Sequence, residues 1–297
     1  MKPAAPIPLF VLLSACAPYQ DQSVPAPLPG VVDAPYRSRP PRAPRPQSPN
    51  PALPGRPQAS TWQPSEAIKS QSLGRGATHH QFTASREGER VEVQLVVFDS
   101  RYSALRVIDQ PSPRAGGWVI SQLMSSHRAL AGVNGGFFHP NFEPLGELVA
   151  NGRKLGKFTD NRLISGSVLV VNREPYLVWN AEFLGESGVS ELIQGGPRLI
   201  DAGQPIPRLN ASKSAPRTFV ATDGKRMWAI GVVRATTLAG LADLLATPGL
   251  LPDIRIRRAL NLDGGQSTAF WARTAAGHEI SQPGWSTVRS YLAVVPK

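Results

Sequence analysis

Short apolar runs that begin in alternation with polar residues recur along the chain from Val91 onward. Residues 91–99 show the pattern most clearly, because they start as Val-Glu-Val-Gln and end as an apolar run, which is typical of a strand inside a sheet. Asp223-Gly224 predicts a hairpin turn, and residues 172–175 predict another. Further strands are predicted at residues 104–109, 130–133, 168–171, 176–179, 192–193, 218–222, 227–233, 259–262 and 291–295.

Two segments have the apolar spacing of helices. Residues 119–129 place apolar side chains three to four positions apart. Residues 237–246 put their leucines on one face, and Thr236 or Thr237 can act as the N-cap. Strands outnumber helices, so we predict an α+β fold that consists mostly of β-strands with a few helices.

Four glycine-rich turns carry polar side chains close to apolar runs. A glycine pair allows positive φ and lets a ligand approach the backbone closely, and a polar residue beside it would project from the end of a strand. Each turn alone is more often a simple tight turn, but together they predict a shared pocket. The turns are Asn134-Gly135-Gly136-Phe137-Phe138, Pro144-Leu145-Gly146 followed by Glu147, Gln194-Gly195-Gly196-Pro197-Arg198 and Asp263-Gly264-Gly265-Gln266-Ser267-Thr268.

These turns combine with three further features: Arg217-Thr218, the helical motif Thr-Leu-x-x-Leu-Ala-x-Leu-Leu at residues 237–245, and Arg289 before the last strand. The combination resembles the phosphodiester glycosidase domain family over about residues 91–295. Asn261-Leu262-Asp263-Gly264-Gly265 is the most specific of its motifs. The resemblance implies hydrolysis of a sugar–phosphate diester that releases the sugar from its anomeric carbon.

The chemistry of such a reaction points to particular side chains. Arg217 and Arg289, which match arginines of the family motif, are candidates for binding phosphate through their guanidinium forks. Asp263 is the best catalytic candidate, as acid/base or as a stabiliser of positive charge on the sugar. Glu147 is second, although the family often has an apolar residue there. The other candidate substrate-binding residues are Asn134, Gly135, Gly136, Gln194, Gly195, Asn261, Gly264, Gly265 and Ser267.

Other chemistries fit the sequence less well. Ser267 resembles a serine-hydrolase nucleophile, but only His278 follows it and no acid lies between them. A zinc site is not expected, because His79 and His80 are adjacent and the chain has no His-Glu-x-x-His motif. We therefore predict no metal site and no cofactor, although a divalent cation near Asp263 stays open. His139 is equally well interpreted as a pocket residue or as a structural histidine.

The N-terminal part of the chain differs in composition from the rest. Leu13-Ser14-Ala15-Cys16 follows a short apolar stretch and resembles the lipobox of bacterial lipoproteins, which implies that residues 1–16 are a signal peptide and that Cys16 is lipidated. Residues 17–60 contain 13 of the 30 prolines, interleaved with arginines, and are predicted to be a disordered tether. Residues 61–297 have even composition and are predicted to form a single globular domain.

These features together predict a place and partners for the protein. A lipid on Cys16 would attach it to a membrane on the periplasmic side of the cell envelope, and Ala17, rather than Asp, after the cysteine favours the outer membrane over the inner. The net charge of +11 does not indicate nucleic-acid binding, because an exported protein rarely meets nucleic acid. The expected partner is a glycan or sugar-phosphate substrate. The alternative is a non-catalytic lipoprotein that binds glycan or cell wall with the same pocket.

Overall fold

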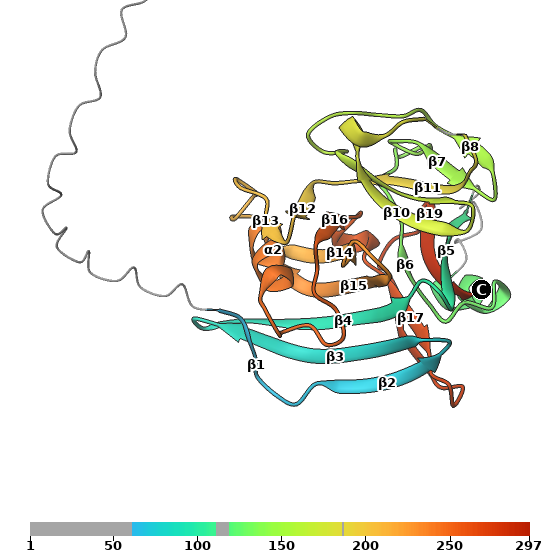
Figure 1. Ribbon diagram of the computed structural model, residues 1–297. Coiled ribbons are helices and arrows are strands. Elements are labelled where there is room, and N and C mark those ends of the chain that lie inside the picture. The colour runs from blue at the N-terminus through green and yellow to red at the C-terminus, as the bar shows by residue number, and fades with distance from the viewer. Residues whose placement is uncertain (1–60, 111–118, 186) are drawn as a thin grey trace, which may run out of the picture. The chain divides into compact units, whose positions relative to one another are not determined.

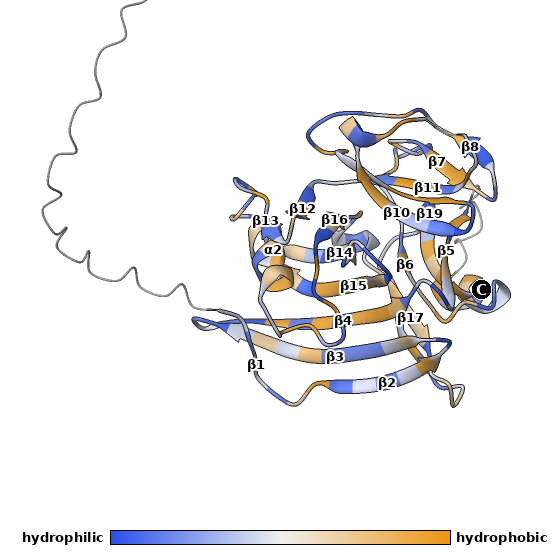
Figure 2. Cartoon of the chain, viewed as in Figure 1, coloured by the Kyte–Doolittle hydropathy of each residue, from blue (hydrophilic) through white to orange (hydrophobic). Residues whose placement is uncertain are grey.

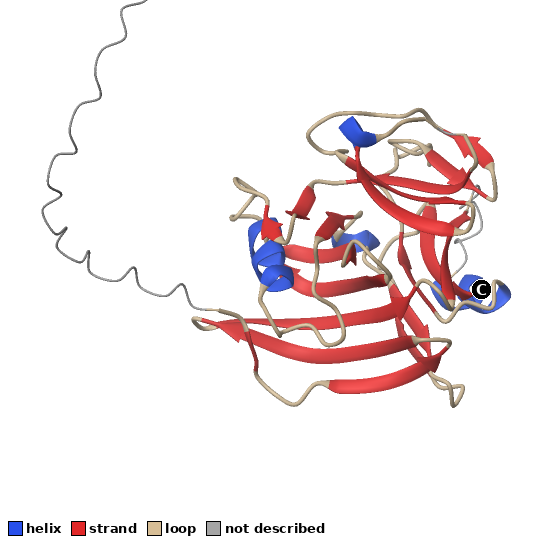
Figure 3. Cartoon of the chain, viewed as in Figure 1, coloured by secondary structure: helices blue, strands red, loops and turns tan. Residues whose placement is uncertain are grey.

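Three antiparallel β-sheets hold most of the regular structure of this computed structural model, which describes residues 61–110, 119–185 and 187–297 (Figure 1). Strands dominate and helices are few, which confirms the predicted α+β class (Figure 3). The predicted signal peptide, the lipidation site at Cys16 and the tether lie outside the described residues.

The first sheet has nine strands in the order β1-β3-β4-β15-β14-β16-β12-β13, with β2 paired to β3. Its central hairpin, β14–β15, turns at Asp223-Gly224 as predicted, and the Asp223 carboxylate accepts a hydrogen bond from the Met227 N–H at 3.0 Å. The strands are β1 (Gln63–Pro64), β2 (Lys69–Gly74), β3 (Ala77–Arg86), β4 (Glu89–Asp99), β12 (Arg198–Asp201), β13 (Gln204–Pro205), β14 (Ala215–Thr222), β15 (Met227–Thr236) and β16 (Arg258–Asn261).

The second and third sheets have five strands each. The second has the order β10-β9-β11-β7-β8 and the third the order β18-β17-β6-β19-β5. The second sheet comprises β7 (Leu148–Ala150), β8 (Arg153–Leu155), β9 (Gly166–Val171), β10 (Glu174–Trp179) and β11 (Val189–Gly195). The third comprises β5 (Ser103–Asp109), β6 (Ala131–Asn134), β17 (Phe270–Arg273), β18 (Glu279–Gln282) and β19 (Ser290–Pro296).

Two α-helices and two 3-10 helices complete the described elements: α1 (Ile120–Ser126), α2 (Leu238–Ala246), η1 (Asn180–Glu182) and η2 (Gly265–Ser267). Thr237 is the N-cap of α2, and its hydroxyl accepts a hydrogen bond from the Gly240 N–H at 2.9 Å. The helix α1 is shorter than predicted, because Arg128 adopts a positive φ of 52° that no helix continues. No helix in the described ranges is long and apolar enough to cross a membrane.

The buried apolar side chains form one cluster shared by the three sheets and further clusters between single sheets and the helices. One cluster includes residues of all three sheets, among them Phe98, Val133 and Ile193. A second cluster packs α2 against the first sheet through Leu241 and Phe219, while the helix α1 packs against the third sheet. Figure 2 shows the apolar colouring along β4, while β2 is more hydrophilic. Each fully buried Leu or Phe contributes about 1.5–3 kcal/mol relative to an exposed side chain, so these layers fix the strand ends rigidly.

Candidate active site

Four strands from two different sheets meet in one hydrogen-bonded row, three of them at their ends. The Gly135 N–H donates to the Ser290 carbonyl at 2.7 Å, and the Gly135 carbonyl accepts from the Asp263 N–H at 3.1 Å. On the other side, the Leu262 N–H donates to the Thr218 carbonyl at 2.9 Å. The ends of β19 and β6 in the third sheet are thereby joined to the end of β16 and to Thr218, within β14, in the first. We call this row the strand-end seam.

Asp263 lies partly buried in the strand-end seam, two residues after the end of β16. Burial raises the pKa of its carboxyl group above the ordinary value, while hydrogen bonds from Ser267 and from the Gly264 N–H act in the opposite direction. The bond from the Gly264 N–H to Asp263 Oδ1 is 2.9 Å long. A carboxyl group with a raised pKa can exchange a proton near neutral pH more readily than an exposed one, which suits acid–base chemistry.

Arg217 lies on the strand that faces Asp263 in the strand-end seam. The register of the β14–β16 pair, extended past the end of β16, places Arg217 opposite Asp263. A Cβ atom added to the next residue, Gly264, would lie 3.9 Å from Arg217 Cδ. The Arg217 guanidinium donates to the carbonyls of Thr236 (3.1 Å) and Lys213 (2.7 Å). Among the described residues no carboxylate forms an ion pair with it, and burial lowers its pKa. Arg217 is therefore a partly buried cation without an anionic partner in the described ranges.

Arg289 stands at the other end of the strand-end seam, beside Ser290. Its Nε donates to Asp109 Oδ1 at 2.7 Å, and its Nη1 donates to the Phe142 carbonyl at 2.7 Å. Asp109 also pairs with Arg153, so this carboxylate is shared by two cations. Asp109 was not a candidate from the sequence, because it lies 180 residues from Arg289 and no local motif marks it.

A hollow of about 570 Å³ opens beside Arg289. Arg289 lines this hollow together with His139, which the sequence left open as a pocket or a structural histidine, while Asp263 and Arg217 do not. The structure thus brings Arg217 and Asp263 to facing backbone positions, with the Arg217 guanidinium bound to the carbonyls of Thr236 and Lys213. It directs Arg289 into a separate hollow. The hollow is lined by His139, Glu143, Pro144, Leu145, Leu155, Gly156, Lys157, Thr159 and Arg289.

Asn134 is fully buried at the centre of the strand-end seam, at the end of β6. Its amide nitrogen donates to the Asp263 carbonyl at 2.7 Å. Its Oδ1 accepts from the Thr218 hydroxyl at 2.6 Å and from the Ala269 N–H at 3.1 Å. Both polar atoms of the side chain are engaged within the protein, so Asn134 fixes the position of Asp263 through backbone contacts.

Replacing Asn134 with Ala should therefore destabilise the fold. Three buried groups would lose their partner, and we expect a loss of about 3 kcal/mol in the free energy of unfolding. Urea denaturation followed by circular dichroism measures the loss. Asn141→Ala is the control, because Asn141 caps an exposed turn, and its loss should stay below about 1 kcal/mol. A stable Asn134→Ala protein that no longer binds substrate would instead make Asn134 a substrate ligand.

Gln194 joins three segments that are far apart in the sequence. Its Oε1 accepts from the N–H groups of Glu147 and Thr159, each at 2.8 Å, and its amide nitrogen donates to the Thr159 carbonyl at 2.9 Å. Glu147 is buried at the start of β7, where its carboxylate lies 3.1 Å from Lys154 Nζ. The polar atoms of Gln194 therefore bind the backbone of two loops, and Lys154 is the cation that lies next to Glu147.

Most glycines of these pairs are needed because the backbone packs closely there, and not because their φ angle is positive. A Cβ on Gly136 would lie 2.6 Å from the Gln194 carbonyl oxygen, which real Cβ atoms do not approach. Gly195 likewise packs against the Asn261 carbonyl. The Asn261 amide nitrogen donates to the Gly196 carbonyl at 2.8 Å, but its buried Oδ1 has no hydrogen-bond partner in the part of the chain that the structure describes. Gly265 differs from the others, because it has a φ of +64° and open space around it.

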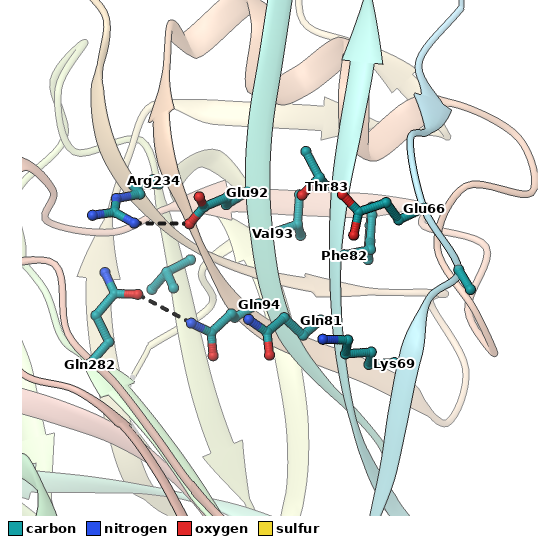
Figure 4. Close-up of a pocket in the computed structure, with 12 residues that line it drawn as sticks. Glu66, Lys69, Gln81, Phe82, Thr83, Glu92, Val93, Gln94, Arg234 and Gln282 are labelled. Atoms are coloured by element: carbon teal, nitrogen blue, oxygen red, sulfur yellow. Dashed lines mark hydrogen bonds and ion pairs between the residues drawn. The ribbon is translucent and has the colours of Figure 1, made fainter.

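Other polar groupings lie away from the strand-end seam. One of these groupings lines a hollow with a volume of about 200 Å³. In it, Arg234 pairs with Glu92 within the first sheet, and Gln94 of the first sheet donates a hydrogen bond to Gln282 on β18 of the third sheet (Figure 4). His79 and His80 are buried in β3, and burial lowers the pKa of His79 to about 4. Within residues 61–110, 119–185 and 187–297, no three His, Cys, Asp or Glu side chains cluster as metal ligands would.

The fold is a β-rich domain in which glycine turns and polar groups lie where two sheets meet. A family model described as phosphodiester glycosidase matches residues 127–295, more than half of the chain, and the chain belongs to this family. The family that the motifs resembled is thereby confirmed. Comparison with curated proteins gives no match.

Solved structures share the fold at low sequence identity. The chain is similar to the zebrafish N-acetylglucosamine-1-phosphodiester alpha-N-acetylglucosaminidase catalytic domain auto-inhibited by pro-peptide, with 14% identity and a TM-score of 0.58 over 80% of this chain and 89% of that one. A hypothetical protein from Synechocystis has 16% identity and a TM-score of 0.54, over 78% of this chain and 64% of that one. A Burkholderia pseudomallei protein, provisionally described as exported, has 14% identity and a TM-score of 0.50, over 82% of this chain and 99% of that one.

Proposed function

We propose that the protein is an exported, lipid-anchored hydrolase that cleaves the glycosidic bond of a sugar-phosphate diester in envelope or exopolysaccharide material. Membership of the phosphodiester glycosidase family supports the reaction type. The observation that supports the site best is Asp263, a partly buried carboxyl group that lies opposite a cation, Arg217, with no carboxylate partner in the described ranges. The lipobox-like residues before Cys16 support export and anchoring.

The reaction adds water across the bond between the anomeric carbon and the phosphate oxygen. The electron pair of that bond leaves with the phosphate, so the products are a free sugar and a phosphomonoester. The phosphate is a good leaving group, so a single carboxyl group suffices in this proposal. Asp263 accepts the proton of the attacking water or stabilises the positive charge that develops on the sugar. Arg217 holds the phosphate, and its charge stabilises the leaving group.

A panel of α- and β-linked hexose and N-acetylhexosamine phosphodiesters tests the proposal directly. The purified protein should release free sugar and phosphomonoester from at least one member, detected by reducing-sugar assay and by ³¹P NMR. The oxygen from ¹⁸O-labelled water should appear in the sugar and not in the phosphate. Label in the phosphate would contradict glycosidic cleavage. Binding of these compounds without any turnover would favour the alternative, a non-catalytic glycan- or wall-binding lipoprotein.

Anchoring is tested separately at Cys16, the only cysteine of the chain. Cells that express the full chain should incorporate an alkynyl fatty-acid probe into the protein, and the Cys16→Ser variant should lose the label and leave the membrane fraction. We expect the labelled protein in the outer-membrane fraction, on its periplasmic side. Equal labelling of Cys16→Ser would contradict lipidation without affecting the proposed reaction.

A further inference from the structure

Trp285 differs from every other tryptophan that the structure describes. Its side chain is 91% exposed, while the others, Trp62, Trp179, Trp228 and Trp271, are at most 4% exposed. An indole ring in water is unfavourable, because burial of an aromatic side chain removes about 150–250 Å² of surface from water. Such a residue on a rigid segment is therefore available to a ligand with an apolar surface.

The segment that carries Trp285 is fixed to the turn that follows Asp263. The N–H groups of Trp285 and Ser286 both donate to the Gln266 carbonyl, at 2.8 and 3.2 Å. The preceding Gly284 packs so closely that an added Cβ would lie 3.2 Å from the Ser267 carbonyl oxygen. Gln266 and Ser267 belong to η2, and Ser267 also donates a hydrogen bond to Asp263. Two hydrogen bonds, joined through the Gln266–Ser267 backbone, thus connect Trp285 to the candidate catalytic carboxyl group of Asp263.

A hollow of about 190 Å³ lies beside the indole ring. Its floor is buried, with Ala269 and Tyr291, whereas Trp285 and Ser286 stand at the exposed rim. Ala269 donates its N–H to Asn134 Oδ1, so the floor of this hollow is directly attached to the strand-end seam. The hollow therefore combines an exposed flat ring, a small apolar floor and a fixed connection to Asp263.

We propose that Trp285 and this hollow form a subsite for a pyranose ring of the substrate, with the indole stacked on the C–H face of the sugar. A pyranose presents axial hydrogens on one face and hydroxyls at its edge, which matches an apolar platform with a polar rim. The backbone anchors hold the segment before binding, so that only the indole side chain has to be ordered when the sugar stacks. The inference rests on the proposed function, and it adds a sugar-recognition residue outside the family motifs.

Kinetics with the panel member that turns over fastest test the subsite. Trp285→Ala should raise KM about tenfold, the loss of roughly 1.4 kcal/mol of stacking, with a much smaller effect on kcat. Trp285→Phe, which keeps a flat ring, should stay within about threefold of the wild type. Tyr176→Ala is the matched control, because Tyr176 is 49% exposed on β10 and should change neither constant. Unchanged KM in Trp285→Ala would overturn the subsite and leave the proposed reaction intact.

Fluorescence gives a readout that does not depend on turnover. Trp285 is the exposed indole of the described chain, so α-hexose 1-phosphates and N-acetylhexosamine 1-phosphates should shift its emission and protect it from acrylamide quenching. The shift should disappear in Trp285→Phe and persist in the Asp263→Asn variant. If no phosphodiester is hydrolysed but the shift is present, the proposed reaction fails and the subsite stands. If none of these sugar phosphates changes the emission, the subsite is wrong.

Discussion

Replacing Asp263 with Asn should lower kcat for a glycosyl phosphodiester by about 10²–10⁴, the usual contribution of one acid–base group. Asn keeps the shape of the side chain and can still accept the hydrogen bond from the Gly264 N–H, so the fold of the turn should survive. Turnover of a chromogenic sugar phosphodiester measures the effect. Asp243→Asn is the matched control, because Asp243 lies on α2 in a surface ion pair with Arg86 and should retain full activity.

The same variant should also become more stable at neutral pH. Burial raises the pKa of Asp263 in the folded state above its ordinary value of 3.8. The folded protein therefore binds this proton more tightly than the unfolded chain does, so the contribution to stability is full below pH 3.8 and is lost as the pH rises through the folded pKa. Asn carries no charge, and Asp263→Asn should raise Tm at pH 7 relative to the wild type, with a gain that vanishes below pH 3.8.

Two results would contradict this account of Asp263. Full turnover by a folded Asp263→Asn protein would remove it from the catalytic machinery. A fall in Tm at pH 7 would show that the hydrogen bonds from Ser267 and Gly264 outweigh the cost of burying the carboxylate. The Tm of Asp243→Asn, measured over the same pH range, controls for general effects of removing an acidic group.

Replacing Arg217 with Lys should lower kcat/KM by about 10²–10³, although the positive charge is kept. The guanidinium has several donors in a fixed plane, two of which already bind the carbonyls of Thr236 and Lys213 and so orient the group. Lysine can satisfy neither this geometry nor a bidentate phosphate contact. Steady-state kinetics measure the loss, with Arg234→Lys as control, because Arg234 is exposed and paired with Glu92.

The activity of an Arg289→Lys variant distinguishes two possible positions of the substrate phosphate. Arg289 already binds Asp109 and opens into the hollow beside His139, and Asp263 is not among the residues that line this hollow. An equal loss in Arg217→Lys and Arg289→Lys would mean that the substrate extends over both cations. Full activity of Arg217→Lys, with a loss only in Arg289→Lys, would move the phosphate to the hollow and contradict the role proposed for Arg217.

The local features of the fold could be predicted from the sequence. The β14–β15 hairpin follows from Asp223-Gly224 between apolar runs, and α2 follows from its leucine spacing and a Thr cap. These elements depend on interactions within a few residues, which the sequence displays directly. The first strands could not be predicted from the sequence, because β2 is mostly exposed and polar, and β3 buries His79 and His80 at positions where an amphipathic strand usually has apolar residues.

The family of the chain could be predicted from the sequence, because the motifs that mark it are short and contiguous: the glycine turns, Asn261-Leu262-Asp263 and the two arginines. The same motifs nominate the candidate site residues. The partners of each polar group, by contrast, follow from the packing of the sheets. Asn134 and Gln194 satisfy backbone groups as far as 135 and 47 positions away, and Arg289 meets Asp109 across the third sheet. Hydrogen-bond partners depend on strand order and on which sheets meet, and these are set by the packing of the whole core. A polar residue at a strand end therefore has the same sequence signal whether it binds a substrate or its neighbour.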